Sequence, residues 1–389
     1  MTTPNPSALV IVGSGLAAWT LAREVRKLDA QRPLVLVTRD DGGFYSKPML
    51  SNALASGRSP QSLVTNAGAA AAEAIGATLL DHREAVAIDV GLQRLALDDR
   101  TVDYEQLVLA VGADPIRLPL AGAPEVIAQA VFSVNDLADY ARFRAALPPR
   151  ARVAVLGAGL IGCEFANDLI LGGHQVAAVD PAPQPLGRLV PAPIGRALED
   201  ALTGAGVVFH LGTTAQSIER QGEAYELRLA NGAVLTVDLV LSAVGLRPRT
   251  QLACAAGLVV DRGIVVDETL QTSASAVYAV GDCAQVHGQV LPYVMPLMVG
   301  ARALAKTLTG VRTPVRYPVM PVVVKTPLLP VTVVAPAAAF EAQWHAVANA
   351  EGLEFHCLDE HARLVGFALS GAACGRRAAL VQRVGQPLA

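Results

Sequence analysis

The chain has 389 residues, of which 52% are hydrophobic and 17% charged, so it can build large buried cores. This composition excludes intrinsic disorder and a coiled coil. At roughly 150 residues per domain the length suggests two or three domains. A net charge of −3 gives no electrostatic argument for a nucleic-acid-binding protein.

Apolar stretches are present, but none predicts a membrane span, which needs about 20 consecutive apolar residues. The run at 8–19 is shorter and is followed by charged residues, and 322–340 is interrupted by Lys325 and three prolines. No positively charged segment precedes the first run, so it does not resemble a signal peptide. Buried strands explain the mean hydropathy of +0.40. With unpaired cysteines as well, we expect a cytoplasmic protein.

Two segments of the chain look alike. Residues 8–18 and 152–162 each consist of a short β-branched run followed by a Gly-x-Gly turn. A helical stretch follows each turn, at 19–28 and 163–171, and a second apolar run comes next, at 34–38 and 176–180. A Gly-rich turn between a strand and a helix is typical of dinucleotide binding: the glycines permit the tight turn and the close approach of a pyrophosphate to the helix N-terminus. The sequence therefore predicts two β-α-β dinucleotide-binding units.

The end of the second strand differs between the two units. Asp180 lies 18 residues after Gly162, where a carboxylate accepts a hydrogen bond from a ribose hydroxyl and repels a 2′-phosphate. The second unit is therefore expected to bind NAD rather than NADP. The first unit has Thr38 at this position, so its ribose contact is expected at Arg39 or Asp40, or at the backbone.

The later segments complete the predicted architecture. Apolar runs near 106–115 and 238–248 each end in Gly and a Pro-bounded turn, and the run 271–282 ends in Gly281-Asp282. From about residue 317 the chain shows strand-like runs at 322–325, 331–334, 355–358 and 364–368, and a helical patch near 372–384. We predict an α/β protein with two Rossmann-like dinucleotide-binding domains and a small α+β C-terminal domain.

The five cysteines (Cys163, Cys254, Cys283, Cys357 and Cys374) include no Cys-x-x-Cys pair. A zinc site, an iron–sulfur cluster or a dithiol close in sequence is disfavoured, and we expect the thiols to pack as small apolar groups. The seven histidines show no metal-binding spacing, so no metal ligand is predicted.

Several motifs together resemble the FAD-dependent pyridine-nucleotide reductases with two dinucleotide-binding domains, and within them the bacterial rubredoxin–NAD(+) reductases. They are YSKPMLS at 45–51, GAGLIGCEFANDL at 157–169, AVGLRPRT at 243–250, YVMPL at 293–297 and VVKTP at 323–327. The resemblance covers nearly the whole chain and implies a glutathione-reductase-like fold. It implies a discontinuous FAD domain at 1–115 and 245–316, an NAD domain at 116–244, and a C-terminal domain at 317–389 that covers part of the flavin.

The resemblance also implies how the ligands are bound. The FAD contacts are expected at Gly13, Ser14, Gly15, Leu16, Ala17, Arg39, Asp40, Lys47, Pro48, Ala85, Ala110, Gly112, Gly281, Asp282, Val294 and Lys325. Glu164 is expected as a further flavin contact. NADH is expected at Gly157, Gly159, Leu160, Ile161, Gly162 and Asp180, and Gly245 is expected to contact one of the two cofactors. Asp282 would hold the ribityl chain of FAD.

Two residues are candidates for a direct part in catalysis. Lys47 would place its ammonium near the flavin, where negative charge develops on reduction, although a solvated loop lysine is the alternative. Glu164 would face the cofactors, or else be an ordinary surface glutamate, and a Lys47–Glu164 ion pair is our hypothesis. Lys325 is costly to bury in an apolar run unless it is paired, which favours a cofactor contact. A helix over 296–308, with Pro296 at its first position, would direct its N-terminus at the flavin.

Disulfide reductases of this class carry a cysteine pair beside the flavin, and single-cysteine members carry one near 45–51, but this chain has Ser46 and Ser51 there. Electrons are therefore expected to leave FAD for an external carrier, most simply the small acidic iron protein rubredoxin, in a chain such as alkane hydroxylation. A basic docking cluster is proposed at Arg302, Lys306, Arg312 and Arg316. The alternatives are a ferredoxin reductase of an oxygenase system, a flavorubredoxin reductase in nitric oxide detoxification, or an NADH-sensing flavoprotein with little turnover, similar to apoptosis-inducing factor.

Overall fold

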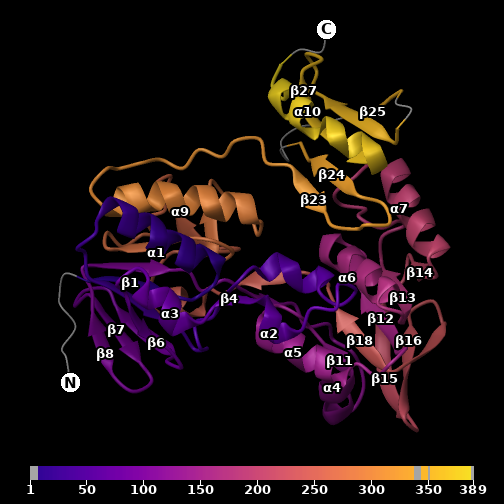
Figure 1. The fold of residues 1–389 in the computed structure, drawn as a ribbon, viewed down its shortest axis with the longest axis horizontal. Coiled ribbons are helices and arrows are strands. Elements are labelled where there is room, and N and C mark those ends of the chain that lie inside the picture. The colour runs from indigo at the N-terminus through magenta and orange to yellow at the C-terminus, as the bar shows by residue number, and fades with distance from the viewer. Residues whose placement is uncertain (1–7, 337–342, 349–350, 387–389) are drawn as a thin grey trace. The chain divides into compact units, whose positions relative to one another are not determined.

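The computed structural model describes residues 8–336, 343–348 and 351–386 (Figure 1). The chain divides into two compact units. Unit 1 comprises Met1–Lys47, Gln61–Asp114 and Leu246–Pro318, and unit 2 comprises Pro48–Pro60, Pro115–Gly245 and Val319–Ala389.

A five-stranded parallel sheet forms the centre of unit 1. Its order is β21 (Val277–Ala279), β9 (Gln106–Leu109), β1 (Leu9–Val12), β2 (Leu34–Val37) and β5 (Thr78–Leu80). Every residue of β1 is buried, as expected for the central strand of a sheet that is covered on both faces. Because the chain continues from β1 to one side and returns on the other, the end of β1 is a topological switch point, where ligands bind in such sheets.

Two helices, α1 (Leu16–Leu28) and α9 (Val294–Leu308), lie side by side against this sheet (Figure 1). The Thr20 hydroxyl of α1 donates a hydrogen bond to the Met298 sulfur of α9. The other elements of unit 1 are α3 (Gly68–Glu73), α8 (Gln251–Ala255), the hairpin-like pair β3 (Phe44–Tyr45) and β4 (Val64–Asn66), the antiparallel β6 (Ala85–Asp89), β7 (Arg94–Leu97) and β8 (Thr101–Asp103), and the parallel pair β20 (Ile264–Val266) and β22 (Ala284–Val286).

Unit 2 contains a second parallel sheet of the same design. Its order is β11 (Val131–Phe132), β18 (Leu239–Ser242), β12 (Arg152–Leu156), β13 (Gln175–Asp180) and β14 (Val208–Leu211). The end of β12 is again a switch point. The helices are α4 (Pro124–Ala130), α5 (Leu137–Ala146), α6 (Leu160–Leu171) and α7 (Ala192–Gly204), and an antiparallel sheet consists of β15 (Ala215–Gln221), β16 (Ala224–Leu229) and β17 (Val234–Val237).

The C-terminal part of unit 2 is an antiparallel sheet. Its order is β23 (Val322–Val324), β24 (Val331–Val334), β27 (Leu364–Ser370), β26 (Glu354–Leu358) and β25 (Gln343–Val347). The 3₁₀ helix η2 (Gly371–Arg376) and α10 (Arg377–Arg383) follow it, and Leu380 of α10 packs on Phe367 of β27 in a small buried cluster. Short elements occur where the chain passes from one unit to the other: η1 (Lys47–Asn52), α2 (Pro60–Leu63), and the paired strands β10 (Ala113–Pro115) and β19 (Leu246–Pro248).

The predicted fold class is confirmed: there are two Rossmann-like sheets and a small α+β domain. Two details were wrong. The helix expected over 296–308 begins at Val294, so Pro296 is its third residue, still within the first turn where a helix needs no amide donor. Strand β25 was not predicted.

Residues 337–340 of the apolar stretch at 322–340, together with residues 1–7 and 387–389 at the ends of the predicted domains, lie outside the described residues. Among the described residues, no helix has the length and apolar character to cross a bilayer.

Candidate dinucleotide and electron-transfer sites

The two glycines that follow β1 are glycine for different structural reasons. Gly13 has φ +122°, and a Cβ there would lie 2.3 Å from the Ala110 carbonyl oxygen, so only glycine fits. A Cβ on Gly15 would meet nothing within 4 Å. Gly15 is therefore not required by packing inside the protein. The open space beside it suits a pyrophosphate that approaches the backbone.

The second glycine loop repeats this arrangement in unit 2. A Cβ on Gly157 would lie 2.7 Å from the Ala243 carbonyl oxygen, whereas one on Gly159 would meet nothing within 4 Å. A Cβ on Gly162 would lie 1.7 Å from the Gly157 carbonyl oxygen, so this glycine allows α6 to pack closely on β12. Neither α1 nor α6 has a side-chain cap or an acidic residue in its first turn. Both helix N-termini therefore keep amide groups directed at a potential anion.

At the end of β2, Asp40 organises the loop that faces the first glycine turn. Its Oδ1 accepts hydrogen bonds from the Thr38 hydroxyl at 2.6 Å, the Ser14 hydroxyl at 2.8 Å and the Gly42 amide at 2.9 Å. Burial alone would raise the pKa of Asp40, but these hydrogen bonds outweigh it and the pKa is lowered. Asp40 thus remains ionised beside the loop, which fits a hydroxyl-binding role. The ribose contact at Arg39, Asp40 or the backbone stays a prediction.

The carboxylate of Asp180 is tied to the second glycine loop. Its Oδ2 accepts from the Ala158 amide at 2.6 Å and its Oδ1 from the Ala182 amide at 2.7 Å. Each carboxylate oxygen has a second lone pair, so these contacts orient the group and leave acceptor capacity for a ribose hydroxyl. The geometry is compatible with the predicted NAD contact.

The Gly281-Asp282 turn lies next to the start of α1. Gly281 has φ +83°, and a Cβ there would come within 2.9 Å of the Ala17 Cβ. The Asp282 Oδ2 lies 3.7 Å from the Lys47 Nζ, so these two predicted flavin contacts attract each other within unit 1. This distance is longer than a hydrogen bond, and the attraction is therefore Coulombic.

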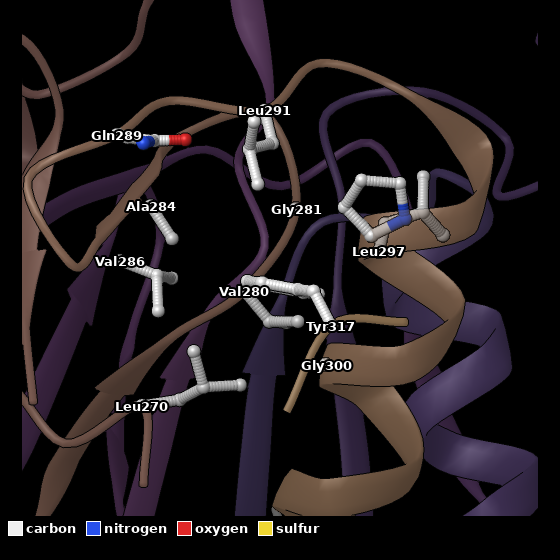
Figure 2. A pocket seen from close by; sticks show the side chains of 11 residues that line it. Leu270, Val280, Gly281, Ala284, Val286, Gln289, Leu291, Leu297, Gly300 and Tyr317 are labelled. Carbon is white, nitrogen blue, oxygen red and sulfur yellow. The ribbon is translucent and has the colours of Figure 1, made fainter. Parts of the chain in front are cut away.

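A small pocket lies between the Gly281 turn and α9 (Figure 2). Gly281 and Val280 border it on one side, and Leu297 and Gly300 of α9 on the other. The lining is apolar apart from Gln289 and Tyr317, so it presents no charged group to a phosphate. The N-terminus of α9 has no side-chain cap, and Val294 there is 38% exposed, which leaves it accessible to a ligand.

Glu164 is fully buried in α6, so the alternative of an ordinary surface glutamate is wrong. Its Oε2 accepts from the Ser51 hydroxyl at 2.5 Å and from the Lys325 Nζ at 2.6 Å, and its Oε1 accepts from the Lys325 amide at 2.9 Å. The charge of Lys325 and three hydrogen bonds compensate the burial of the carboxylate.

Lys325 has three partners for its ammonium, all of them in unit 2. Besides Glu164, its Nζ contacts the Pro48 carbonyl oxygen at 2.7 Å and the Ser51 hydroxyl at 3.1 Å. An ammonium has three N–H donors, and this protein environment uses all of them. A direct hydrogen bond from Lys325 to a cofactor would therefore require the loss of one of these contacts. The carboxylate of Glu164 compensates the cost of burying the Lys325 ammonium.

The predicted site residues are divided between the units. Unit 1 contains Gly13, Ser14, Gly15, Leu16, Ala17, Arg39, Asp40, Lys47, Ala85, Ala110, Gly112, Gly281, Asp282 and Val294. Unit 2 contains Pro48, Gly157, Gly159, Leu160, Ile161, Gly162, Glu164, Asp180, Gly245 and Lys325. The hypothesised Lys47–Glu164 ion pair joins the two units and stays a prediction. Within the units, Lys47 pairs with Asp282 and Glu164 pairs with Lys325.

The sequence did not single out Ser51, Asn167 and Asp168 as site residues, and all three are buried polar groups on or against α6. Asn167 and Asp168 follow Glu164 at the i+3 and i+4 positions of the helix, so the spacing was visible. Polar residues at that spacing more often mark a solvated face, and only the long-range contacts show otherwise.

All five cysteines are free thiols. Cys163 and Cys283 are buried, and burial raises the pKa of both thiols, that of Cys283 to about 11. A thiol is already reduced, and a protonated, buried thiol is also a poor nucleophile, so neither cysteine is suited to relay electrons. In the part of the chain that the structure describes, no three His, Cys, Asp or Glu side chains are grouped so as to hold a metal ion.

The two glycine loops at switch points and the two parallel sheets define a reductase fold with two dinucleotide-binding domains. Residues 7–303 match the family described as pyridine nucleotide-disulphide oxidoreductase, and residues 314–384 match the family described as rubredoxin binding C-terminal domain.

The chain is 45% identical to the rubredoxin-NAD(+) reductase of Alcanivorax borkumensis over 367 residues, which cover 94% of this chain and 95% of that protein. It is 39% identical to the nitric oxide reductase FlRd-NAD(+) reductase of Aeromonas hydrophila over 365 residues, 93% of this chain and 92% of that protein. The crystal structure of the covalent putidaredoxin reductase–putidaredoxin complex aligns with a TM-score of 0.87 at 28% identity, covering 98% of this chain and 94% of that chain.

The chain belongs to the pyridine nucleotide-disulphide oxidoreductase family. Its cofactors are FAD and NADH.

Proposed function

We propose that this chain transfers electrons from NADH, through FAD, to rubredoxin. The observation that carries the proposal is the combination of two dinucleotide-binding glycine loops with a C-terminal domain that matches the rubredoxin-binding description. FAD supplies the chemistry that accepts two electrons as hydride from NADH and releases them singly to a one-electron carrier.

The residues of the chain bind and orient the two dinucleotides. The uncapped N-terminus of α1 and the Gly15 backbone would hold the FAD pyrophosphate, and the Asp282 carboxylate would accept hydrogen bonds from the ribityl hydroxyls. Lys47, beside Asp282, would place positive charge near the reacting end of FAD. In unit 2, the N-terminus of α6 and Asp180 would bind NADH.

All five cysteines are free thiols, which are already reduced, so none forms a disulfide that could accept the electrons. The family takes its description from disulphide reduction, but no cysteine follows Tyr45 in the 45–51 motif, and Cys163 lies buried in α6. The electrons therefore leave for another protein, and this supports rubredoxin as the acceptor.

The docking cluster at Arg302, Lys306, Arg312 and Arg316 remains part of the proposal. All four side chains are exposed in unit 1. Arg312 lies 4.0 Å from Asp267 and 3.9 Å from Glu268, so nearby acidic groups offset part of its charge. Replacing Arg302 and Lys306 by Glu is expected to lower the rate with rubredoxin and not with ferricyanide. Equal rates of the variant and the parent with rubredoxin would reject the cluster.

A second candidate acceptor is flavorubredoxin, because a relative with 39% identity is named as a reductase of FlRd. The test is NADH oxidation by the purified protein with rubredoxin, flavorubredoxin and a [2Fe–2S] ferredoxin offered side by side. We expect the highest kcat/KM with rubredoxin. A preference for ferredoxin, or slow reduction by NADH with every acceptor, contradicts the proposal, and the latter result would favour the NADH sensor.

The setting of the reaction is also a proposal. A cytoplasmic location is supported by NADH as the electron donor and by five free thiols. A hydroxylase such as an alkane-oxidising enzyme is the proposed consumer of the electrons, which the resemblance described above supports.

A further inference from the structure

Helix α6 carries a stripe of buried polar side chains. Glu164, Asn167 and Asp168 lie at i, i+3 and i+4 and therefore share one face of the helix. Asn167 is 1% exposed and Asp168 is 3% exposed. Such groups are costly to bury without partners, so their contacts show what the stripe does.

Asp168 binds the segment that follows η1. Its Oδ2 accepts a hydrogen bond from the Leu54 amide, and its Oδ1 accepts one from the Ala55 amide, both at 2.9 Å. At the end of the helix, a Cβ on Gly172 would come within 1.9 Å of the Leu54 side chain, so the absence of a side chain makes room for this segment.

Asn167 binds the C-terminal domain. Its Oδ1 accepts a hydrogen bond from the Leu328 amide at 3.2 Å, in the turn after Lys325. The Asn52 amide group adds a bond to the Lys325 carbonyl oxygen at 3.1 Å. The helix, the 48–55 segment and the 325–328 turn are thus connected pairwise, and the Glu164–Lys325 pair lies among them.

We propose that Asn167 and Asp168 are positioning residues for electron transfer to the partner protein: they hold the C-terminal domain and the 48–55 segment in one orientation on the NADH-binding helix. Neither side chain touches a reacting group. Each acts through the backbone that it holds, Asn167 through the turn that carries Lys325 and Asp168 through the segment that carries Ser51 and Pro48. This inference deepens the proposed function and rests on it, because the C-terminal domain is taken to dock rubredoxin.

The experiment compares the holoenzyme with the variants Asn167→Leu and Asp168→Leu, which keep the branched shape of the side chain and remove the acceptors. Asp168→Asn, which keeps one acceptor, is the conservative variant, and Leu171→Ala is the control, on the same helix and at a residue that is 47% exposed. The measurements are kcat/KM for rubredoxin, the ferricyanide rate with NADH, and hydrogen exchange of the amides.

We expect each Leu variant to lower kcat/KM for rubredoxin about tenfold, because a buried backbone amide left without its acceptor disfavours the productive orientation by a free energy of that size, while the ferricyanide rate changes by less than about twofold. Exchange should accelerate at Leu328 in Asn167→Leu, and at Leu54 and Ala55 in Asp168→Leu. Asp168→Asn should recover most of the loss with rubredoxin, and Leu171→Ala should resemble the parent.

Three results would overturn the positioning role. They are an unchanged kcat/KM for rubredoxin despite faster exchange, an equal fall with both acceptors, and an Asp168→Asn variant as impaired as Asp168→Leu. If Asp168→Leu does not fold, Asn167→Leu, a change between neutral side chains, decides the matter. If the parent holoenzyme itself does not reduce rubredoxin, the proposed function is refuted. This result needs no variant, so it is distinct from a failure of the positioning role.

Discussion

The pairing of Lys325 with Glu164 predicts a measurable loss of stability in Lys325→Met. Methionine keeps most of the length of the side chain but removes the ammonium, so a fully buried carboxylate retains only the Ser51 hydroxyl and one backbone amide as donors. Breaking a buried ion pair costs about 3–5 kcal/mol. Because the Lys325 side chain is 33% exposed, water replaces part of the lost interaction, and we expect about 2–3 kcal/mol.

A double-mutant cycle that combines Lys325→Met with Glu164→Gln separates the effect of charge from that of packing. The amide oxygen of glutamine still accepts a hydrogen bond, and in the double variant, which also lacks the ammonium, no uncompensated charge remains. The double variant Lys325→Met, Glu164→Gln should therefore recover to within about 1 kcal/mol of the Glu164→Gln variant. Lys306→Met, at an exposed lysine of α9, is the control for the loss of a lysine and should lie within about 0.5 kcal/mol of the parent.

The two tryptophans allow unit 2 to be observed by itself. Trp344 lies in β25, and Trp19 is fully buried in α1 of unit 1. In a Trp19→Phe background, urea unfolding followed by Trp344 emission reports the C-terminal sheet. A change below about 0.5 kcal/mol in Lys325→Met, or a double variant less stable than Lys325→Met, would refute the argument that the ammonium compensates the buried charge.

Four further predictions concern the cofactor sites. Gly281→Ala should weaken FAD binding at least about tenfold in a fluorescence titration, because the new Cβ meets Ala17 at 2.9 Å and the backbone has φ +83°; full retention of FAD would contradict this. Asp180→Ala should raise the Kd for NADH about tenfold and change kcat less than twofold, and an unaltered Kd would remove Asp180 from the site. Because the pKa of Asp40 is lowered in the folded protein, its contribution to stability is present above the ordinary value of 3.8 and is lost as the pH falls through the lower folded value. Asp40→Ala should therefore reduce stability near neutral pH, and its midpoint of urea unfolding should fall less steeply than that of the parent as the pH is lowered. A midpoint that falls as steeply as in the parent argues against this role of Asp40. Cys163→Ala should leave turnover with rubredoxin within about twofold, whereas a loss of more than about tenfold would indicate a thiol in the electron path.

The two glycine turns were predictable because their causes are local. Gly13 and Gly157 are required by a carbonyl oxygen that meets the glycine turn, and each such turn lies between a strand and a helix that the sequence pattern already indicates. The two sheets followed from this repeat, and β9 and β18 were recognised by their apolar runs. Strand β25 was missed because Gln343–Val347 contains polar and exposed residues without a clear alternation.

The partners of the buried charges were not predictable, because they are distant in the sequence. Glu164 meets Ser51 across 113 positions and Lys325 across 161. The sequence indicated that Lys325 needs a partner, but a cofactor and a carboxylate satisfy that need equally well. Only the fold shows that the carboxylate comes from α6, the helix that follows the second glycine loop.

The polar stripe on α6 can fix the register of the neighbouring segments, which an apolar contact would not do. Apolar side chains at positions 167 and 168 would also hold a neighbouring segment, but hydrophobic contact has no direction and tolerates a shift in register. Hydrogen bonds to the backbone amides of Leu54, Ala55 and Leu328 are made only in one register. Electron transfer to a docked protein requires a reproducible geometry, and a wrongly placed segment would leave these buried acceptors unsatisfied. The stripe therefore makes one orientation of the C-terminal domain on α6 more stable than its alternatives.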